Sequence, residues 1–301
     1  MAEYLSKENF VFSMSGEHKP ALKVKSGTEV ILETYDCFCD QIKSEEVNFD
    51  GIDWEKINPA TGPVYIENAM PGDILKVQIK KIELEDEGTV MTGPELTPMG
   101  DKIPEYALKK VPIQNGTIQF NENIRIPVNP MIGVIGVAPK EGSINNGTPH
   151  DHGGNMDTKL ITEGATVYFP VFHEGALFSL GDVHAAMGDG EVGASGVEIA
   201  SKVTVRLCVI KGASIPTPVV ENDDGFAFIV SRETLDEAAD TATQYMADYL
   251  VEKAGISLSE AMMLLSLTGQ LQISQVVDPL KTARMYLPKS VMEMLNIKKL
   301  F

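Results

Sequence analysis

Short runs of hydrophobic residues, separated by turn-forming residues, fill the first two thirds of the chain. The runs are rich in β-branched side chains, and most are bounded by Gly, Pro, Asn or Asp. This pattern is typical of β-strands, and none of the intervening segments has a long apolar period of 3.6 residues. The predicted strands are residues 21–25, 29–34, 74–79, 131–137, 165–172 and 203–210.

The first two predicted strands are connected through Ser26-Gly27. A Gly turn between two β-rich runs is a hairpin signal, so these strands are predicted to pair with each other. Together with the later strands they indicate a mainly β fold, an antiparallel β-sandwich or barrel. We assign this body, a β-sandwich-like catalytic unit, to residues 1–220.

The last part of the chain, residues 221–301, has a different pattern. A turn at residues 222–225 precedes a short predicted strand at residues 226–230. Apolar residues then recur at helical spacing between Leu235 and Leu250. We therefore predict a smaller C-terminal α+β portion packed on the body.

Three local signals place the helices of this portion. Gly255 is suited to end the first helix. Ser257 and Glu260 have the spacing of a capping box, which predicts a second helix through about residue 267. Pro288 suits the first turn of a third helix.

Charge and composition exclude several classes of function. The chain has 301 residues, with 25 Lys plus Arg against 43 Asp plus Glu, and a formal charge of −18. Such a surplus of acid makes nucleic acid and anionic membranes unsuitable partners, because no basic excess exists to neutralise phosphates. The 43% of hydrophobic residues places the chain among folded globular proteins.

Cysteine usage and the first twenty residues suggest a compartment. The three cysteines, Cys37, Cys39 and Cys208, cannot all pair within one chain, which favours a reducing environment. Residues 1–20 contain several charged side chains and no secretory pattern, and no apolar run reaches the ~18 to 20 residues of a membrane helix. We therefore expect a soluble, cytoplasmic protein with no membrane partner.

Histidines are scarce and clustered. Four of the five, His150, His152, His173 and His184, lie in one stretch of the chain. That stretch includes two segments rich in Gly, Asp, Glu and His, residues 149–157 and 181–191. In an extended chain residues i and i+2 face the same side, so three pairs can each present two ligands. These pairs are His150 with His152, Asn155 with Asp157, and Asp182 with His184.

Two interpretations of these segments are open. Mixed imidazole and carboxylate sets suit zinc or another divalent ion, whereas all-oxygen sets suit calcium or magnesium. The alternative is that the segments are solvated turns, because Gly, Asn and Asp favour turns in any context.

Other motifs carry less weight. Residues 188–193 match a dinucleotide fingerprint, but they follow no clear strand and contain two acids that would repel a pyrophosphate. Cys37 and Cys39 lack the spacing of common zinc-thiolate sites, so buried or inert thiols are favoured there. Cys208 lies in an apolar strand pattern, where a nucleophilic thiol would be poorly exposed. The chain has no Gly-x-Ser-x-Gly elbow, Walker A loop or His-Glu-x-x-His helix.

At these residues the chain resembles the acetamidase/formamidase family. The resemblance is carried by residues 153–157, the long motif at 181–191, residues 196–199, and Asp36 with Gln41-Ile42 near the front. Residues 261–272 and Asp278-Pro279 are also similar to that family. The resemblance implies a β-sandwich body, a bound divalent metal, and hydrolysis of a small carboxamide to its acid and ammonia.

A divalent ion can assist both partners of amide hydrolysis, and a nearby carboxylate can carry the proton. We expect zinc, with calcium as the alternative, and Glu191 as general base. Asn155 is the expected substrate-binding residue. The expected metal ligands are His184, Asp36, Asp157 and Glu198, with Asp182 and His152 in reserve.

The expected substrate is a small neutral linear amide such as formamide or acetamide, which a strongly acidic protein does not repel. The helical C-terminal portion also suggests a homo-oligomer, a dimer, in which it packs between subunits. The main rival is a non-catalytic β-sandwich module that binds calcium or carbohydrate through its acidic loops. A second rival is a hydrolase of a cyclic amide or an ester.

Overall fold

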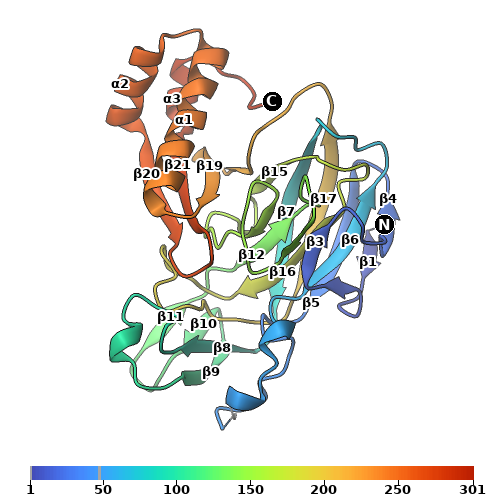
Figure 1. Cartoon of the computed structure of the whole chain (residues 1–301), viewed down its shortest axis with the longest axis vertical. Helices are drawn as coiled ribbons and strands as arrows, with labels where there is room; N and C mark the ends of the chain where they lie inside the picture. Colours follow the sequence, from blue (N-terminus) through green and yellow to red (C-terminus); the bar gives the residue numbers. More distant parts are fainter. Residues whose placement is uncertain (1, 47–48) are drawn as a thin grey trace.

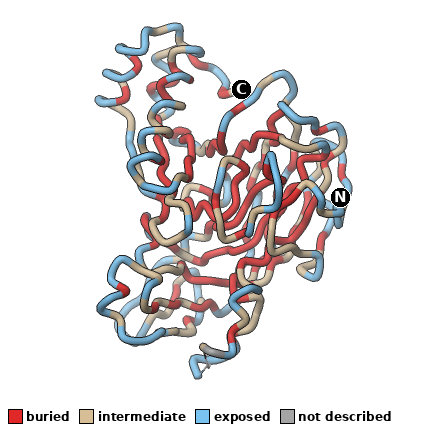
Figure 2. Tube along the Cα trace, in the orientation of Figure 1, coloured by how far each residue is buried: buried red, intermediate tan, exposed pale blue. Residues whose placement is uncertain are grey.

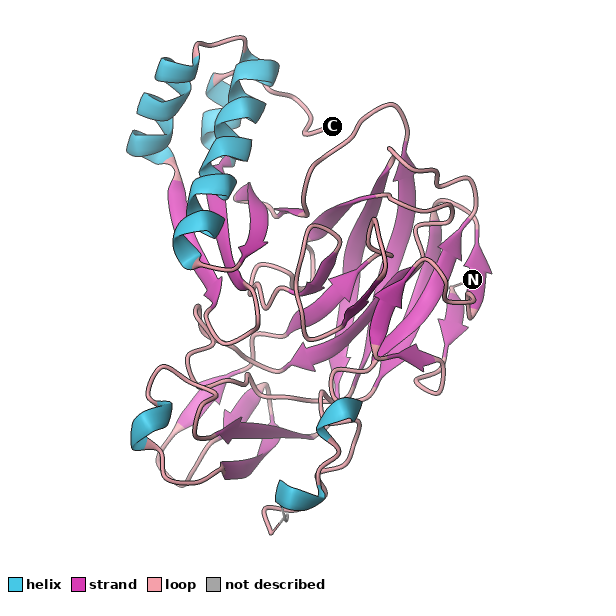
Figure 3. Cartoon of the chain, viewed as in Figure 1, coloured by secondary structure: helices cyan, strands magenta, loops and turns pink. Residues whose placement is uncertain are grey.

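Strands dominate the computed structural model, which describes residues 2–46 and 49–301 (Figures 1 and 3). The largest sheet has nine strands in the order β1 (Glu3–Leu5), β5 (Thr28–Thr34), β17 (Ser201–Ile210), β7 (Ile74–Leu84), β15 (Thr166–Pro170), β18 (Val219–Glu221), β19 (Gly225–Arg232), β21 (Lys281–Pro288) and β20 (Gln270–Gln275). A six-stranded sheet contains β14 (Gly153–Asn155), β12 (Met131–Gly136), β16 (Phe178–His184), β6 (Ala60–Ile66) and β2 (Phe10–Val11), with β4 (Leu22–Val24) beside β6.

Smaller elements complete the fold. A four-stranded sheet has the order β11 (Arg125–Pro127), β10 (Thr117–Gln119), β9 (Ala107–Gln114) and β8 (Glu87–Thr92), and β13 (Ser143–Asn145) pairs with β3 (Ser13–Ser15). The helices are α1 (Leu235–Ala254), α2 (Leu258–Thr268) and α3 (Lys289–Met294), with 3₁₀ turns at Phe49–Gly51, Trp54–Lys56 and Gly100–Lys102.

The two large sheets enclose one hydrophobic core. Leu32 and Val205 of the nine-stranded sheet belong to the same buried cluster as Ile132 and Phe178 of the six-stranded sheet. Figure 2 shows this buried chain running through the middle of the molecule. Strand pairing is mainly antiparallel, with parallel pairs at β1–β5 and β4–β6. The predicted mainly antiparallel β-sandwich is therefore confirmed.

The hairpin predicted around Ser26-Gly27 is wrong, although both of its strands exist. β4 pairs with β6 in one sheet, whereas β5 pairs with β1 and β17 in the other. Gly27 N–H donates to Leu207 O, and Ser26 Oγ accepts from Val209 N–H, so the turn is fixed to β17. A Gly turn that carries the chain from one layer of a sandwich to the other has the same local sequence as a hairpin turn.

The predicted C-terminal α+β portion is present and continues the large sheet. β19, β21 and β20 extend it beyond β18, so the sheet crosses the proposed division between residues 1–220 and 221–301. α1 packs on these strands, where Met246 and Leu250 share a buried cluster with Phe228 and Leu287. Figure 1 shows the three helices together at one end of the molecule. The division into two domains stays a prediction.

Helix ends follow the predicted signals closely. Gly255 ends α1 in the left-handed region, at φ 67°. Ser257 and Glu260 make both hydrogen bonds of a capping box at the start of α2. Thr234 and Glu237 form a second capping box before α1. Pro288 precedes α3 as its N-cap residue and does not lie in the first turn.

The longest helix in the described ranges, α1, has 20 residues and includes acidic and basic side chains. Across the described residues, no helix combines the length and the apolar character that crossing a membrane requires.

Candidate active site

Three carboxylates converge on one imidazole nitrogen at the end of β16. His184 Nε2 lies 3.1 Å from Glu198 Oε2, 3.4 Å from Asp182 Oδ1 and 3.9 Å from Asp157 Oδ1. All four residues are buried. Since buried ionisable groups are costly unless they are paired or bind a metal, this cluster has a functional rather than a packing origin.

Neighbouring strands fix the backbone of the cluster. The backbone of Glu198 forms single antiparallel β-bridges with His184 and with Thr89. Glu198 N–H donates to Thr89 O at 2.8 Å. Gly133 on β12 leaves room for the carboxylates, because a Cβ there would collide with Asp157 Oδ1 and Asp182 Oδ2.

Three acids of the site have unusual backbone conformations. Asp157, Asp182 and Glu191 have φ values of 40°, 51° and 44°. Non-glycine residues rarely occupy the left-handed region, and they do so at functional sites when the surrounding structure imposes the strain. Here the strain orients each carboxylate toward the cluster instead of along a regular strand.

Burial dominates the protonation of the cluster. Burial, reinforced by Asp182, raises the pKa of Asp157 to about 6, and burial raises the pKa of Glu198 to about 8. Burial and the carboxylate of Asp157 raise the pKa of Glu191 well above its usual range. Burial alone would lower the pKa of His184, but Glu198 and Asp182 outweigh it and raise that pKa. Among the described residues the carboxylates therefore have the imidazole of His184, and no Lys or Arg, as a cationic partner.

The cluster opens into a cavity of about 210 Å³. Its walls include Asn155, Asp182, Glu191, Glu198 and Asp278 among the polar residues. The apolar part of the wall comes from Phe38, Trp54, Ile57, Met91, Leu96 and Val277. The cavity thus lies where the sandwich, the chain after β8 and the segment after β20 meet, and it has room for a small ligand.

Asn155 and Asp278 are connected inside this cavity. Asn155 Nδ2 donates a hydrogen bond to Asp278 Oδ1 at 3.2 Å. Asn155 Oδ1 is buried without a hydrogen-bond partner among the described residues. The amide of Asn155 is therefore oriented by Asp278, and its oxygen stays free to accept a hydrogen bond from a ligand.

The structure brings together most of the residues expected at the site. His184, Asp157, Asp182, Glu191 and Glu198 lie in or beside the cluster, and Asn155 lines its cavity. Their individual roles stay predictions.

Asp36 and His152 are placed differently. Asp36 is buried, but its Oδ1 accepts a hydrogen bond from Asp40 N–H at 2.7 Å, and it does not line the cavity. His152 is buried with both ring nitrogens unpartnered among the described residues, and burial lowers its pKa to about 3. Among the described residues, neither Asp36 nor His152 lies in a group of side chains close enough together to hold one metal ion. Both ligand roles stay predictions.

Two members of the site were not expected there. Asp278 comes from the segment after β20, and the familial Asp278-Pro279 pair was its one sequence signal. Cys37 is buried, as expected, but it lies in the cavity wall beside Asp182 and Glu198. Burial and the neighbouring carboxylates raise the pKa of the Cys37 thiol well above its usual range.

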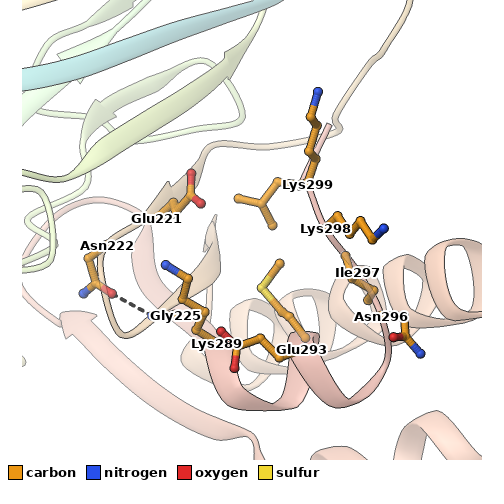
Figure 4. Close-up of a pocket in the computed structure, with 11 residues that line it drawn as sticks. Glu221, Asn222, Gly225, Lys289, Glu293, Asn296, Ile297, Lys298 and Lys299 are labelled. Carbon is orange, nitrogen blue, oxygen red and sulfur yellow. Dashed lines mark hydrogen bonds between the residues drawn. The ribbon is translucent and has the colours of Figure 1, made fainter.

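Larger cavities elsewhere lack this chemistry. One of about 380 Å³ is lined by residues 221–225, α3 and the last residues of the chain, as Figure 4 shows. Its charged side chains are Glu221, Lys289, Glu293, Lys298 and Lys299. In the described residues no group of potential metal ligands falls in that lining, so cavity size does not identify the active site here.

The cluster has the features of a cation site. Both oxygens of Asp157, Glu198 Oε2 and Asp278 Oδ2 are buried without hydrogen-bond partners within residues 2–46 and 49–301. In the same ranges no Lys or Arg forms an ion pair with Asp157, Asp182, Glu191, Glu198 or Asp278. Carboxylate and imidazole donors together suit a divalent ion such as zinc, so the residues present fit a metal.

Comparison with known proteins identifies the family. The sequence model of the Acetamidase/Formamidase family matches residues 16–147 and 142–294. The structure of a recombinant predicted acetamidase/formamidase from the thermophile Thermoanaerobacter tengcongensis is 52% identical, with a TM-score of 0.97 over 99% of each chain. The structure of an acetamidase from Bacillus halodurans is 46% identical, with a TM-score of 0.96 over 98% of this chain and 100% of that one.

Curated relatives match over shorter ranges. A formamidase from Methylophilus methylotrophus is 44% identical over 64 residues, which cover 21% of this chain and 16% of that protein. The chain spans less than two thirds of the length of the curated relatives it matches. The family model nevertheless covers most of the chain, and the chain belongs to the acetamidase/formamidase family.

Proposed function

We propose that the protein hydrolyses small linear carboxamides, such as formamide and acetamide, to the carboxylic acid and ammonia with the help of a divalent metal. Membership of the family supports the reaction type. The observation that carries the proposal is the convergence of three carboxylates on His184 Nε2 beside a cavity of about 210 Å³. This volume suits a molecule of a few heavy atoms, because sites for drug-sized ligands occupy ~300–1,000 Å³.

His184, Asp157, Glu198 and Asp182 are the residues that would hold the ion. Zinc is favoured by the imidazole among the donors, with calcium as the alternative. A divalent ion bound there would act as a Lewis acid toward the amide carbonyl and lower the pKa of water toward ~7.

The chain's own groups supply binding and proton transfer. Asn155 lines the cavity and its Oδ1 has no hydrogen-bond partner among the described residues, so it accepts a hydrogen bond from the substrate NH₂. Asp278 orients Asn155 through the 3.2 Å hydrogen bond. Glu191 lines the same space and takes the proton from the attacking water, then returns it to the leaving nitrogen. A carboxyl group whose pKa is raised by burial is suited to both transfers near neutral pH.

His184 counts against the non-catalytic alternative. A calcium module would be built from oxygen ligands, whereas here an imidazole nitrogen lies at the centre of the carboxylates. A carbohydrate is also too large and too polar for a cavity of about 210 Å³ whose wall is partly apolar.

Metal removal tests the proposal directly. Purified protein is expected to release ammonia from formamide and acetamide, to lose most of that activity after chelation, and to recover it when zinc is added back. Ammonia is measured in each state, with propionamide and a five-membered lactam as substrates that report pocket size. Activity that survives complete removal of the metal, verified by elemental analysis, would contradict the metal role. Hydrolysis of the lactam alone would contradict the linear substrate class.

We further propose that two chains associate through the apolar surface of α2 and β20, here called the α2–β20 surface. Its exposed side chains are Leu258, Met262, Met263, Leu267, Leu271 and Ile273. They present on the order of 600 Å² of apolar area, which reaches the upper end of the patches that monomers expose. A stable interface buries ~800 Å² on each partner, so this surface provides most of the area that one partner contributes.

The sheet edge also favours a second copy as the occupant. β20 is the last strand of the nine-stranded sheet, and Figure 1 shows it with α2 on the outer side of the C-terminal portion. An edge strand can pair with another strand, and a two-fold axis would place two copies of β20 against each other.

Leu267→Glu tests this dimer, because Leu267 is 83% exposed and its substitution costs little in the folded chain. The wild type is expected to have about twice the 32.7 kDa chain mass in light scattering, and the variant the mass of one chain. Met70→Glu, at an exposed site outside this surface, is the matched control and should stay dimeric. A monomeric wild type would overturn the proposal.

We also propose a cytoplasmic location. The support is that Cys37, Cys39 and Cys208 are all free thiols, as expected in a reducing compartment. Recovery of the native protein in a secreted fraction of its host would contradict this location.

A further inference from the structure

The polar and the apolar parts of the active-site wall come from different segments of the chain. The polar part comes mainly from residues 155–198, together with Asp278. The apolar part comes mainly from two other segments, residues 37–42 with 52–58, here called the first arm, and residues 91–106, here called the second arm. A linear amide is divided in the same way, since it has a polar carboxamide at one end and an apolar acyl chain at the other.

The apolar wall begins next to the carboxylate cluster. Met91 lies two residues beyond Thr89 on β8, and Thr89 pairs with Glu198. Ser195 Oγ accepts a hydrogen bond from Met91 N–H at 2.9 Å and donates one to Met91 O at 3.0 Å. Met91 is buried in one cluster with Phe38 of the first arm. The deep part of the apolar wall is therefore fixed beside the residues that hold the carboxamide.

Trp54 lies where the cavity meets solvent. It lines the cavity and is 39% exposed, whereas Phe38 and Met91 are buried. Its ring centroid is 6.0 Å from that of Tyr106 in the second arm, with the planes at 31°. Tyr106 is held close to its own backbone segment, because a Cβ on Gly93 would collide with its ring. The indole thus forms the outer end of the apolar wall and is supported from the second arm.

Gln41 fixes the turn that carries Trp54. Its Nε2 donates to Asp53 O and to Lys56 O, both at 3.3 Å, and its Oε1 accepts from Asp53 N–H at 2.9 Å. Asp53 is the N-cap of the 3₁₀ turn Trp54–Lys56, and its side chain accepts from Glu55 N–H. One side chain therefore bonds both ends of the turn, so the indole has a defined position at the mouth of the cavity.

We propose that Trp54 is a specificity-determining residue, whose indole closes the outer end of the acyl-binding wall and restricts the substrate to short acyl chains. The inference rests on the proposed hydrolysis of linear amides and names the acyl range of that same site. An indole in a fixed position excludes a longer chain by steric conflict. Gln41 is a positioning residue, because it acts on the substrate through the turn that carries Trp54.

Chain-length profiles of the metal-loaded, full-length protein test this role. The kcat/KM of wild type is expected to fall from propionamide to butyramide and valeramide. One methylene in a hydrophobic pocket changes kcat/KM by ~10- to 200-fold. Trp54→Ala should raise the ratio of kcat/KM for butyramide to that for acetamide by about 10-fold, the low end of this range, because the vacated space is open to solvent. Trp54→Phe, which has a smaller ring, should give an intermediate ratio.

Formamide is the internal control, since it has no carbon beyond the carbonyl and its hydrolysis should change least in Trp54→Ala. Met99→Ala is the matched control variant. Met99 belongs to the second arm and is 52% exposed, but it is not among the described residues that line the cavity. Its chain-length profile should equal that of wild type.

Gln41→Met separates positioning from a general structural role. The variant keeps the length of the side chain but forms none of the three hydrogen bonds to the turn. It is expected to raise the ratio of butyramide to acetamide in the same direction as Trp54→Ala, while formamide hydrolysis is retained. A fall in activity on all amides with an unchanged ratio would overturn the positioning role of Gln41.

Fluorescence reports on Trp54 directly, because it is the single tryptophan of the chain. Glu191→Gln is expected to bind amides with little turnover, so it allows a titration at equilibrium. Propionamide should change the emission of this variant with the same half-saturation that calorimetry gives for binding. Binding detected by calorimetry without any change in emission would contradict a contact between the acyl chain and Trp54.

The outcomes separate this inference from the proposed function. An unchanged chain-length profile in Trp54→Ala, in a protein that releases ammonia from formamide, would overturn the role of Trp54 alone. The absence of ammonia release from every linear amide by the metal-loaded wild type would overturn the proposed function, and this inference with it.

Discussion

Glu191→Gln is expected to lower kcat for formamide by about 10²- to 10⁴-fold, the usual contribution of a general acid or base. Glutamine has nearly the same shape, but its amide cannot accept a proton from water and pass it to nitrogen. Since Glu191 is not expected to hold the substrate NH₂, KM should change little. Steady-state ammonia release at saturating substrate measures the effect, with the zinc content of each preparation determined in parallel.

The zinc content decides between two roles for Glu191, which lies in one ligand group with Asp157 and His184. A variant that retains its metal but not its turnover supports the assignment as base. If metal content and activity fall together, Glu191 is a ligand and its assignment as base is wrong. Glu141→Gln, at an exposed loop position, is the matched control and should leave kcat unchanged.

Local patterns predicted the elements well because the relevant forces are local. The apolar spacing from Leu235 to Leu250 and the signals at Gly255 and Ser257 act within one or two turns of helix, and the structure confirms them. Strand pairing is different, since it depends on which layer a strand joins. The turn at Ser26-Gly27 carries the chain between sheets, and nothing within a few residues of it distinguishes that path from a hairpin.

Residues i and i+2 share a side at one predicted ligand pair and not at another. Asp182 and His184 do lie side by side, at 3.4 Å, although Asp182 reaches this position through a left-handed φ of 51°. His150 and His152 separate instead, because His150 is exposed and His152 is buried. Between these two histidines the chain makes a turn, in which His150 and Gly153 bond each other's backbone, so strand alternation does not apply.

Contacts between distant segments of the site were not predictable from the sequence. Asp278 reaches Asn155 across 123 positions, and Cys37 reaches Asp182 and Glu198 through a loop whose path is set by the tertiary fold. Asp36, by contrast, has the residue type of a ligand, but it caps the turn that leads to Asp40. A carboxylate that forms a turn and one that binds a metal look the same in sequence, because both roles favour Asp near Gly or small residues.

The second large effect is expected at Arg284, on β21. Arg284→Met should lower the free energy of unfolding by roughly 1.5–3 kcal/mol, the contribution of the hydrogen bonds that a charged group makes. Arg284 is fully buried, and its Nη2 lies 2.7 Å from Asp189 Oδ1. Its Nε donates to Gln272 Oε1 at 2.8 Å and its Nη1 to Ser274 Oγ at 2.9 Å. Methionine fills the volume but forms none of these hydrogen bonds, although Asp189 keeps its ion pair with Lys159 at 2.8 Å.

Urea denaturation of the wild type, Arg284→Met and Arg206→Met measures the effect. Arg206 is an exposed arginine that bonds one carbonyl, Gly27 O, so its replacement should cost within about 1 kcal/mol. A similarly small loss for Arg284→Met would contradict the prediction. An Asp189→Asn/Arg284→Met double variant should lose less than the sum of the two single variants, because the two side chains interact directly.

Arg284 also connects stability to catalysis. Asp189 lies in the loop that precedes Glu191, and Gly190 bonds Ser274 and Val276 through its backbone, so the same contacts attach this loop to the C-terminal sheet. Without the guanidinium, the loop is expected to be held less tightly and Glu191 to occupy its position for a smaller fraction of the time. Arg284→Met should therefore lower kcat even where the protein remains fully folded, whereas Arg206→Met should not. Ammonia release at a temperature well below the unfolding transition distinguishes this effect from loss of folded protein.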